Sequence, residues 1–163
     1  NEFENLRVAG IRLADLRGYS YDRSDVTGRS LANAYAQTLG SIFTETAKPY
    51  EVEIVVAEVG ADESADQMYR LAFDGSVADE HGFVAMGGSA EAIEGAMSAV
   101  WQSNQDLGTS LHQAVTALGQ HGTDEHRSLS ADDLEVAILD RTRPRRLFHR
   151  LEGDELADLL LSA

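Results

Sequence analysis

The sequence of 163 residues contains no cysteine, which excludes disulfides and thiolate metal sites and suits a reducing compartment. It also lacks an apolar run long enough to cross a bilayer, and its first residues, NEFENLRV, lack the layout of an export signal. We therefore expect a cytoplasmic protein with no membrane partner. Because 43% of the residues are apolar, we expect a single domain with one core over residues 1–163.

Positive charge is scarce in the middle of the chain. Residues 49–140 carry 18 acidic and two basic residues, whereas residues 1–48 carry six of each. This acidic stretch would repel a phosphate backbone, so we expect no nucleic-acid partner. A solvated acidic surface explains the charge without any ligand.

Motifs for catalysis and metal binding are also missing. There is no Gly-x-Ser-x-Gly elbow, and carboxylate pairs such as Asp132 and Asp133 arise by chance among 28 acidic residues. The histidines lack the paired spacing of a zinc helix. They are His81, His112, His121, His126 and His149. We therefore predict no catalytic residue, no metal and no cofactor in this chain.

A glycine-rich stretch, MGGSAEAIEG at residues 86–95, raises the question of a phosphate loop. It has neither the Gly-x-Gly-x-x-Gly pattern of a dinucleotide site nor the Gly-Lys-Ser/Thr of a P-loop. Glu91 and Glu94 would also oppose a bound anion. We therefore interpret Gly87 and Gly88 as a close strand-to-helix turn, and Ser89 as the N-cap of a helix.

Hydrophobic periodicity predicts two helices, three strands, two helices, two strands and a final helix. The first helix ends near Gly18, and the second begins at Asp25 or Thr27 and is closed by Pro49. The strands are expected in YEVEIVVAEVG, MYRLAFDG, GFVAMGG, LEVAILD and RLFHRL. Runs of strands and runs of helices predict an α+β domain with antiparallel pairing and argue against a doubly wound parallel sheet.

The first helix has two apolar sides. Gly10 lies on its broad core face and allows a close approach. The other expected core residues are Phe3, Leu6, Ala9, Leu13 and Leu16. Val8 and Ile11 lie on the opposite side with Arg12 and Asp15 beside them, and a second apolar edge often marks a subunit contact. These four residues are candidate interface residues, with ordinary exposed apolar residues as the alternative.

Five stretches, in order along nearly the whole chain, resemble the alpha-type subunit of the bacterial, actinobacterial-type proteasome core particle. They are NEFENLRVAGIRLADLRGYSYDRSDVTGRSLANAYAQTL, KPYEVEIVVAEVG, YRLAFDGS, FVAMGG and LEVAILDRTRPRR. The resemblance implies the N-terminal nucleophile hydrolase fold, a four-layer αββα sandwich of antiparallel sheets. Family members usually begin with a gate-forming tail, an outer helix and two strands, and we expect these elements to be missing from residues 1–163.

The resemblance also implies a non-catalytic role. Active relatives attack with an N-terminal Thr, Ser or Cys, and Asn1 has no such group. Alpha-type subunits stack as seven-membered rings on catalytic beta-type rings and receive a ring-shaped ATPase activator. The implied partners are thus alpha-type neighbours, the beta-type ring, the ATPase and unfolded polypeptide substrate. The pocket lysine that receives the ATPase tails would lie in the missing N-terminal segment.

In the family, the loop after the second helix lines the narrow entrance of the alpha ring. It precedes a basic-Pro-Tyr-Gly-Val motif, which here has Glu51 in place of glycine. The resemblance implies an entrance role for Thr44, Glu45, Thr46 and Lys48. A plain helix stop at Lys48 and Pro49 explains the same stretch without a ring.

Two other functions remain open from the sequence. One is a catalytically active hydrolase of the same fold, which would cleave small peptides without a partner. The other is a small monomeric acidic domain, which would hold a ligand or a divalent cation at MGGS or in the acidic middle.

Overall fold

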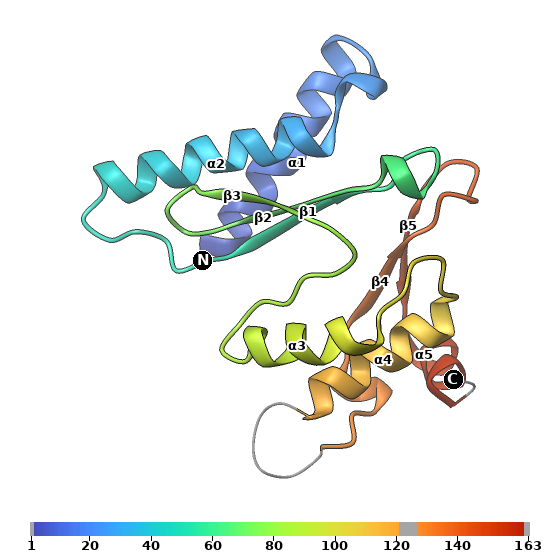
Figure 1. Ribbon diagram of the computed structural model, residues 1–163. Coiled ribbons are helices and arrows are strands. Elements are labelled where there is room, and N and C mark those ends of the chain that lie inside the picture. The colour runs from blue at the N-terminus through green and yellow to red at the C-terminus, as the bar shows by residue number, and fades with distance from the viewer. Residues whose placement is uncertain (1, 121–126, 162–163) are drawn as a thin grey trace. The chain divides into compact units, whose positions relative to one another are not determined.

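The computed structural model describes residues 2–120 and 127–161. The chain forms two compact units, Asn1–His81 and Gly82–Ala163, which are described in turn (Figure 1). The predicted single domain over the whole chain stays a prediction. Among the described residues, no helix combines the length and the apolar character that crossing a bilayer requires.

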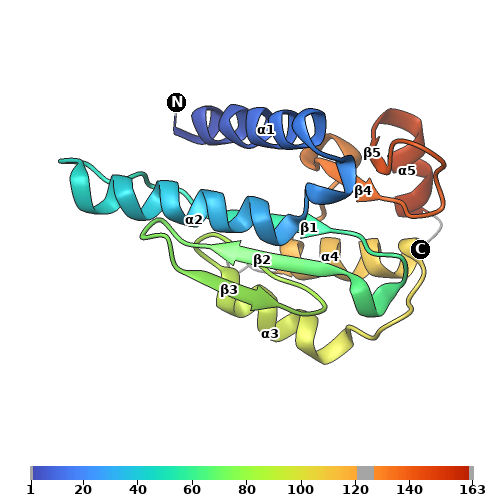
Figure 2. The same ribbon diagram turned by 90° about the horizontal axis from the view of Figure 1, so that it is seen from above.

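The first unit contains two helices and a three-stranded antiparallel sheet. Helix α1 spans Glu2–Ser20 and α2 spans Gly28–Glu45. The strands are β1 (Ile54–Glu58), β2 (Gln67–Leu71) and β3 (Val77–Glu80), in the order β1-β2-β3. Short 3-10 helices cover Arg23–Asp25 and Glu63–Ala65. Figure 2 shows α2 running alongside the three strands.

Local hydrogen bonds explain where α2 begins. The Thr27 hydroxyl accepts from the Ser30 N–H at 3.1 Å, and the Ser30 hydroxyl accepts from the Thr27 N–H at 3.3 Å, which is a capping box. Of the two predicted caps, Thr27 is therefore confirmed, and Asp25 lies in the preceding 3-10 helix. The Gly28 N–H also donates to the Glu58 carboxylate at 2.6 Å, which ties the start of α2 to β1.

The core of the first unit lies between α1, α2 and the sheet. Alternation along the strands brings Val56 opposite Tyr69 and Ile54 opposite Leu71 on the face that packs against α2. Leu39 and Leu71 have no exposed surface. The predicted close approach at Gly10 is confirmed, because a β-carbon there would overlap the Tyr35 hydroxyl.

The predicted core face of α1 is too broad. Leu6 and Gly10 are buried and Leu13 is half-buried, but Phe3 is 62% exposed, Leu16 is 65% exposed, and Ala9 is exposed. The helix contacts its unit through a narrow stripe of residues four apart, so residues at the edges of the predicted face stay outside it. The helix also continues past Gly18 to Ser20.

The second unit contains α3 (Ala90–Val100), α4 (Leu107–Gln120), the hairpin of β4 (Val136–Leu139) and β5 (Phe148–Leu151), and α5 (Gly153–Leu161). A further 3-10 helix covers Ala131–Asp133. The hairpin is antiparallel. Among the described residues of this unit, the buried apolar ones are Met97, Ala117, Leu151 and Leu156. The order of helices and strands, the mixed α+β class and the antiparallel pairing agree with the prediction.

The third strand is displaced from its predicted place. It begins at Val77, directly after the turn at Asp74 and Gly75, and residues 82–88 form no strand. The tight turn reverses the chain, so that β3 pairs with β2 from Val77 onward. The pairing ends at Glu80, which lies opposite Met68. The apolar stretch after it packs differently, with the Phe83 and Trp101 ring centroids 6.1 Å apart.

Candidate functional site

The perturbed aspartates among the described residues belong to turns and helix starts, whereas burial raises the pKa of Tyr35, and the hydrogen bond between Glu4 and Arg7 lowers the pKa of Glu4 and raises that of Arg7. Hydrogen bonds from a Ser or Thr two or three residues away hold the pKa of five aspartates below its ordinary value. These are Asp22, Asp74, Asp106, Asp133 and Asp140. Such bonds are those of caps and Asx turns, so they explain the shifts without an active site.

The structure describes three of the five histidines. His81 and His112 are exposed, and the His149 Nε2 atom lies 3.1 Å from the Glu155 carboxylate. His121 and His126 fall outside the described residues. Within the region of the chain that the structure describes, no group of three or more His, Asp or Glu side chains is placed to hold a metal ion.

The glycine-rich stretch forms a turn before α3. Gly87 has a φ of 107°, which favours glycine, and the Ala90 N–H donates to the Gly87 carbonyl at 3.2 Å. Ser89 holds the N-cap position, but its side chain makes no capping hydrogen bond, so the predicted capping role is wrong in this detail. The Glu94 carboxylate accepts from the Ala85 N–H at 3.3 Å and places negative charge beside the turn, which opposes an anion.

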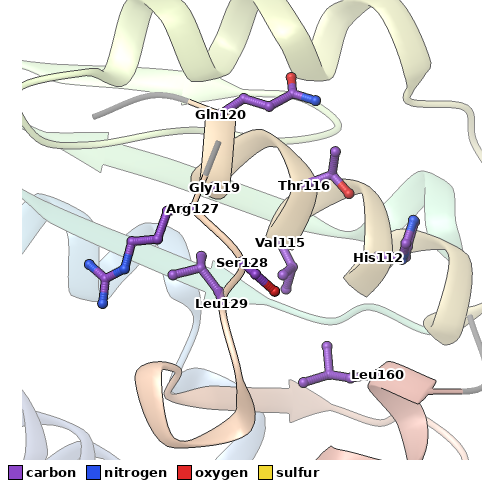
Figure 3. Close-up of a pocket in the computed structure, with 9 residues that line it drawn as sticks. All are labelled: His112, Val115, Thr116, Gly119, Gln120, Arg127, Ser128, Leu129 and Leu160. Atoms are coloured by element: carbon purple, nitrogen blue, oxygen red, sulfur yellow. The ribbon is translucent and has the colours of Figure 1, made fainter. Parts of the chain in front are cut away.

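A hollow of about 370 Å³ lies between α4, the segment from Arg127 and α5 (Figure 3). Its charged and titratable lining residues do not converge, because the Arg127 guanidinium points away from His112. Arg127 instead pairs with the Asp133 carboxylate at 2.8 Å. This arrangement offers no set of groups for acid–base or nucleophilic chemistry.

The residues with a predicted entrance role lie together at the end of α2. Thr44 and Glu45 are in its last turn, Thr46 is its C-cap, and Lys48 follows in the segment that leads to β1. The Thr44 hydroxyl donates to the Gly40 carbonyl at 3.0 Å, and the Thr46 hydroxyl donates to the Ile42 carbonyl at 2.6 Å. The segment is therefore a polar, exposed end of the first unit.

The candidate contact residues lie along one side of α1. Ile11 is 47% exposed, Arg12 and Asp15 are exposed, and Val8 is half-buried. Sequence reasoning missed the exposed aromatic residues near the end of this helix, Tyr19 and Tyr21. The large apolar rings in the polar stretch YSYDRSD could have indicated an exposed aromatic surface from the sequence.

Comparison with known proteins identifies the family. Residues 7–139 match the proteasome subunit family. The proteasome subunit alpha of Kineococcus radiotolerans is 62% identical over 165 residues, which cover 98% of this chain and 70% of that protein. The chain belongs to the proteasome subunit family. The alpha subunits of Xylanimonas cellulosilytica and Thermobifida fusca are 60% and 58% identical and are covered over 67% and 65% of their length.

Membership of this family confirms the resemblance found in the sequence. The chain is an alpha-type subunit, the non-catalytic ring subunit of the proteasome core particle, and it assembles with other proteasome subunits. The alternatives of an active hydrolase and of a monomeric ligand-binding domain are therefore set aside. The chain spans about two thirds of the length of these relatives, from 65% to 70%.

Proposed function

We propose that seven copies of this subunit close into a ring that stacks on a beta-type ring, receives a ring-shaped ATPase and admits unfolded polypeptide. Each full-length subunit would then have the four-layer αββα sandwich. Alternation along the strands supports this, because Val55, Arg70 and Ala78 lie in one row on the sheet face opposite the α2 core. A second sheet can pack against that face.

The observation that carries the entrance role is the exposure of five consecutive residues at the end of α2. Thr44, Glu45, Thr46, Ala47 and Lys48 are all exposed. None of them is a large apolar residue, and a lining without apolar patches does not retain an unfolded chain by hydrophobic contact. A ring of such segments would let an unfolded chain pass toward the catalytic subunits and exclude a folded one.

The contact between neighbours would use the exposed side of α1. Ile11 presents an apolar side chain with Arg12 and Asp15 nearby on the same helix, and this combination suits an interface with an apolar centre and a charged rim. Val8 lies three residues before Ile11 and extends this apolar surface toward the start of the helix.

The native mass of the full-length subunit, expressed with its beta-type partner, tests this proposal. We expect a particle with sevenfold alpha rings, and an Ile11→Glu substitution should shift the mass toward free subunits because it places a charge in the contact. Ala9→Glu adds the same charge at another exposed position of α1 and serves as the control. Circular dichroism would check that both variants fold. Full assembly of Ile11→Glu would refute the contact role, and a monomeric wild type would refute the ring.

A further inference from the structure

The segment between α2 and β1 forms a hydrogen bond with a carboxylate near the start of the chain. The Glu51 N–H donates to the Glu2 Oε2 atom at 3.0 Å across 49 positions in sequence. Glu2 lies in the first turn of α1, and Figure 1 shows the beginning of that helix near the segment that enters β1. We infer that Glu2 is a positioning residue that holds the proposed entrance segment, residues 44–48, in place.

The hydrogen bond is the stronger of the two links that Glu2 makes. The Lys48 Nζ atom lies 3.8 Å from Glu2 Oε1 and 3.7 Å from Glu51 Oε1, but the Lys48 side chain is 69% exposed. Ion pairs in such exposed positions contribute little, whereas a carboxylate that accepts from a backbone N–H makes a charge-assisted bond. Glu2 is better shielded, with 33% of its side chain exposed.

The segment is held on both sides of its exposed tip. On one side, the Thr46 hydroxyl lies within hydrogen-bond distance of the Ile42 and Lys48 carbonyls, at 2.6 and 3.0 Å, which extends the end of α2. On the other side, Tyr50 packs against the core, and the next residue, Glu51, bonds to Glu2. Ala47 and Lys48 lie between these anchors and are exposed. Loss of Glu2 would leave the packing of Tyr50 as the remaining anchor on that side and give the segment more conformational freedom.

The consequence for passage rests on the proposed entrance role. A segment held at both ends presents a fixed width to a chain that threads through the ring, because fewer backbone conformations are open to it. A segment released at the Glu51 end would let a wider range of chains pass. Glu2 thereby affects the passage of polypeptides without touching them.

Hydrogen exchange of the peptide around Glu51, in the full-length subunit assembled with its beta-type partner, tests the anchor directly. We expect Glu2→Ala to speed exchange of the Glu51 amide about five- to tenfold, since its acceptor is lost. Glu2→Gln keeps an acceptor oxygen and should restore most of the protection. Glu4→Ala removes a carboxylate from the same helical turn and is the control, because Glu4 bonds to Arg7.

A second measurement on the same particles separates the anchor from the entrance role. The rate of degradation of an unfolded protein is divided by the rate of hydrolysis of a tetrapeptide, and Glu2→Ala should raise this ratio several-fold over Glu4→Ala. Unchanged exchange in Glu2→Ala would overturn the inference. Faster exchange of the Glu51 amide with an unchanged ratio of the two rates would support the anchoring role of Glu2 and overturn the entrance role of residues 44–48.

Discussion

Gly10 of α1 lies directly against the phenol of Tyr35 on α2, so that a β-carbon at position 10 would overlap the tyrosine hydroxyl. This contact lets the two helices approach closely around Leu6 and Leu31. Burial of the phenol raises the pKa of Tyr35 above its ordinary value. The pair therefore sets how α1 sits on the core of its unit.

Gly10→Ala should destabilise the first unit. Alanine favours a helix over glycine by up to about 1 kcal/mol, but forcing a side chain into a filled site costs about 1–3 kcal/mol, so we expect a net loss. Gly18→Ala is the control, since a β-carbon there makes an ordinary contact with Val26 at 3.5 Å and should raise stability. Urea unfolding of both variants measures the difference. Equal or greater stability of Gly10→Ala than of Gly18→Ala would contradict the close approach.

Gly75→Ala should cost more stability than Gly87→Ala. Both glycines have positive φ angles, 86° and 107°, where an L-residue is strained by about 1–3 kcal/mol. At Gly75 a β-carbon would also lie 2.6 Å from the Ala36 carbonyl oxygen, whereas at Gly87 no atom lies within 4 Å. Thermal unfolding midpoints should therefore rank wild type above Gly87→Ala and Gly87→Ala above Gly75→Ala. The reverse order of the two variants would show that the turn at Gly75 is not in close steric contact with α2.

Thr27→Ala should lower the free energy of unfolding by about 1 kcal/mol, because α2 loses the side chain that caps its first turn. Thr27→Ser keeps the hydroxyl and should retain most of this stability. Urea titrations that follow helix content can resolve the two variants. If Thr27→Ser were as unstable as Thr27→Ala, the cap would not explain where α2 begins.

Acid should weaken the start of α4. The Thr109 backbone N–H and hydroxyl donate to the Asp106 carboxylate and hold its pKa below the ordinary value. A carboxylate with a lowered pKa in the folded state stabilises the fold above its unfolded pKa of about 3.9, and this stabilisation is lost as the pH falls through the lowered pKa.

Asp106→Asn tests this dependence, because asparagine keeps a capping oxygen but does not titrate there. The unfolding temperature of the wild type should exceed that of Asp106→Asn at pH 7, and the difference should shrink as the pH falls through the lowered pKa of Asp106. Asp158→Asn removes the same charge from an exposed position of α5 and controls for net charge. A difference in unfolding temperature that grows as the pH falls would contradict the stabilising role of the ionised Asp106 carboxylate.

Local patterns were enough to predict most elements of the fold. The run from Leu31 to Ile42 has helical spacing and a capping threonine just before it, so α2 could be placed closely. The third strand was misplaced because FVAM is apolar and resembles a strand, whereas the turn at Gly75 starts the pairing at Val77. A helical wheel gave the direction of the α1 core face but not its width, so the exposure of Phe3 and Leu16 was missed.

The candidate site could be predicted mainly from the family resemblance. Residues 44–48 form a short polar stretch, and such a stretch has no pattern that distinguishes a ring entrance from an ordinary helix end. The bond between Glu2 and Glu51 joins residues 49 positions apart, and no local spacing rule connects them. The contact roles of Val8, Ile11, Arg12 and Asp15 stay predictions for the same reason.

Cross-linking at Ala47 tests the central claim most directly. The 163 residues contain no cysteine, so Ala47→Cys introduces one thiol into the proposed entrance segment, once any cysteine elsewhere in the full-length subunits is replaced. In the assembled particle, a short bismaleimide should join neighbouring copies into linked pairs, because each chain carries one thiol and each thiol forms one bond to the reagent. An intact particle whose chains stay unlinked would contradict the claim that these segments meet around a common entrance.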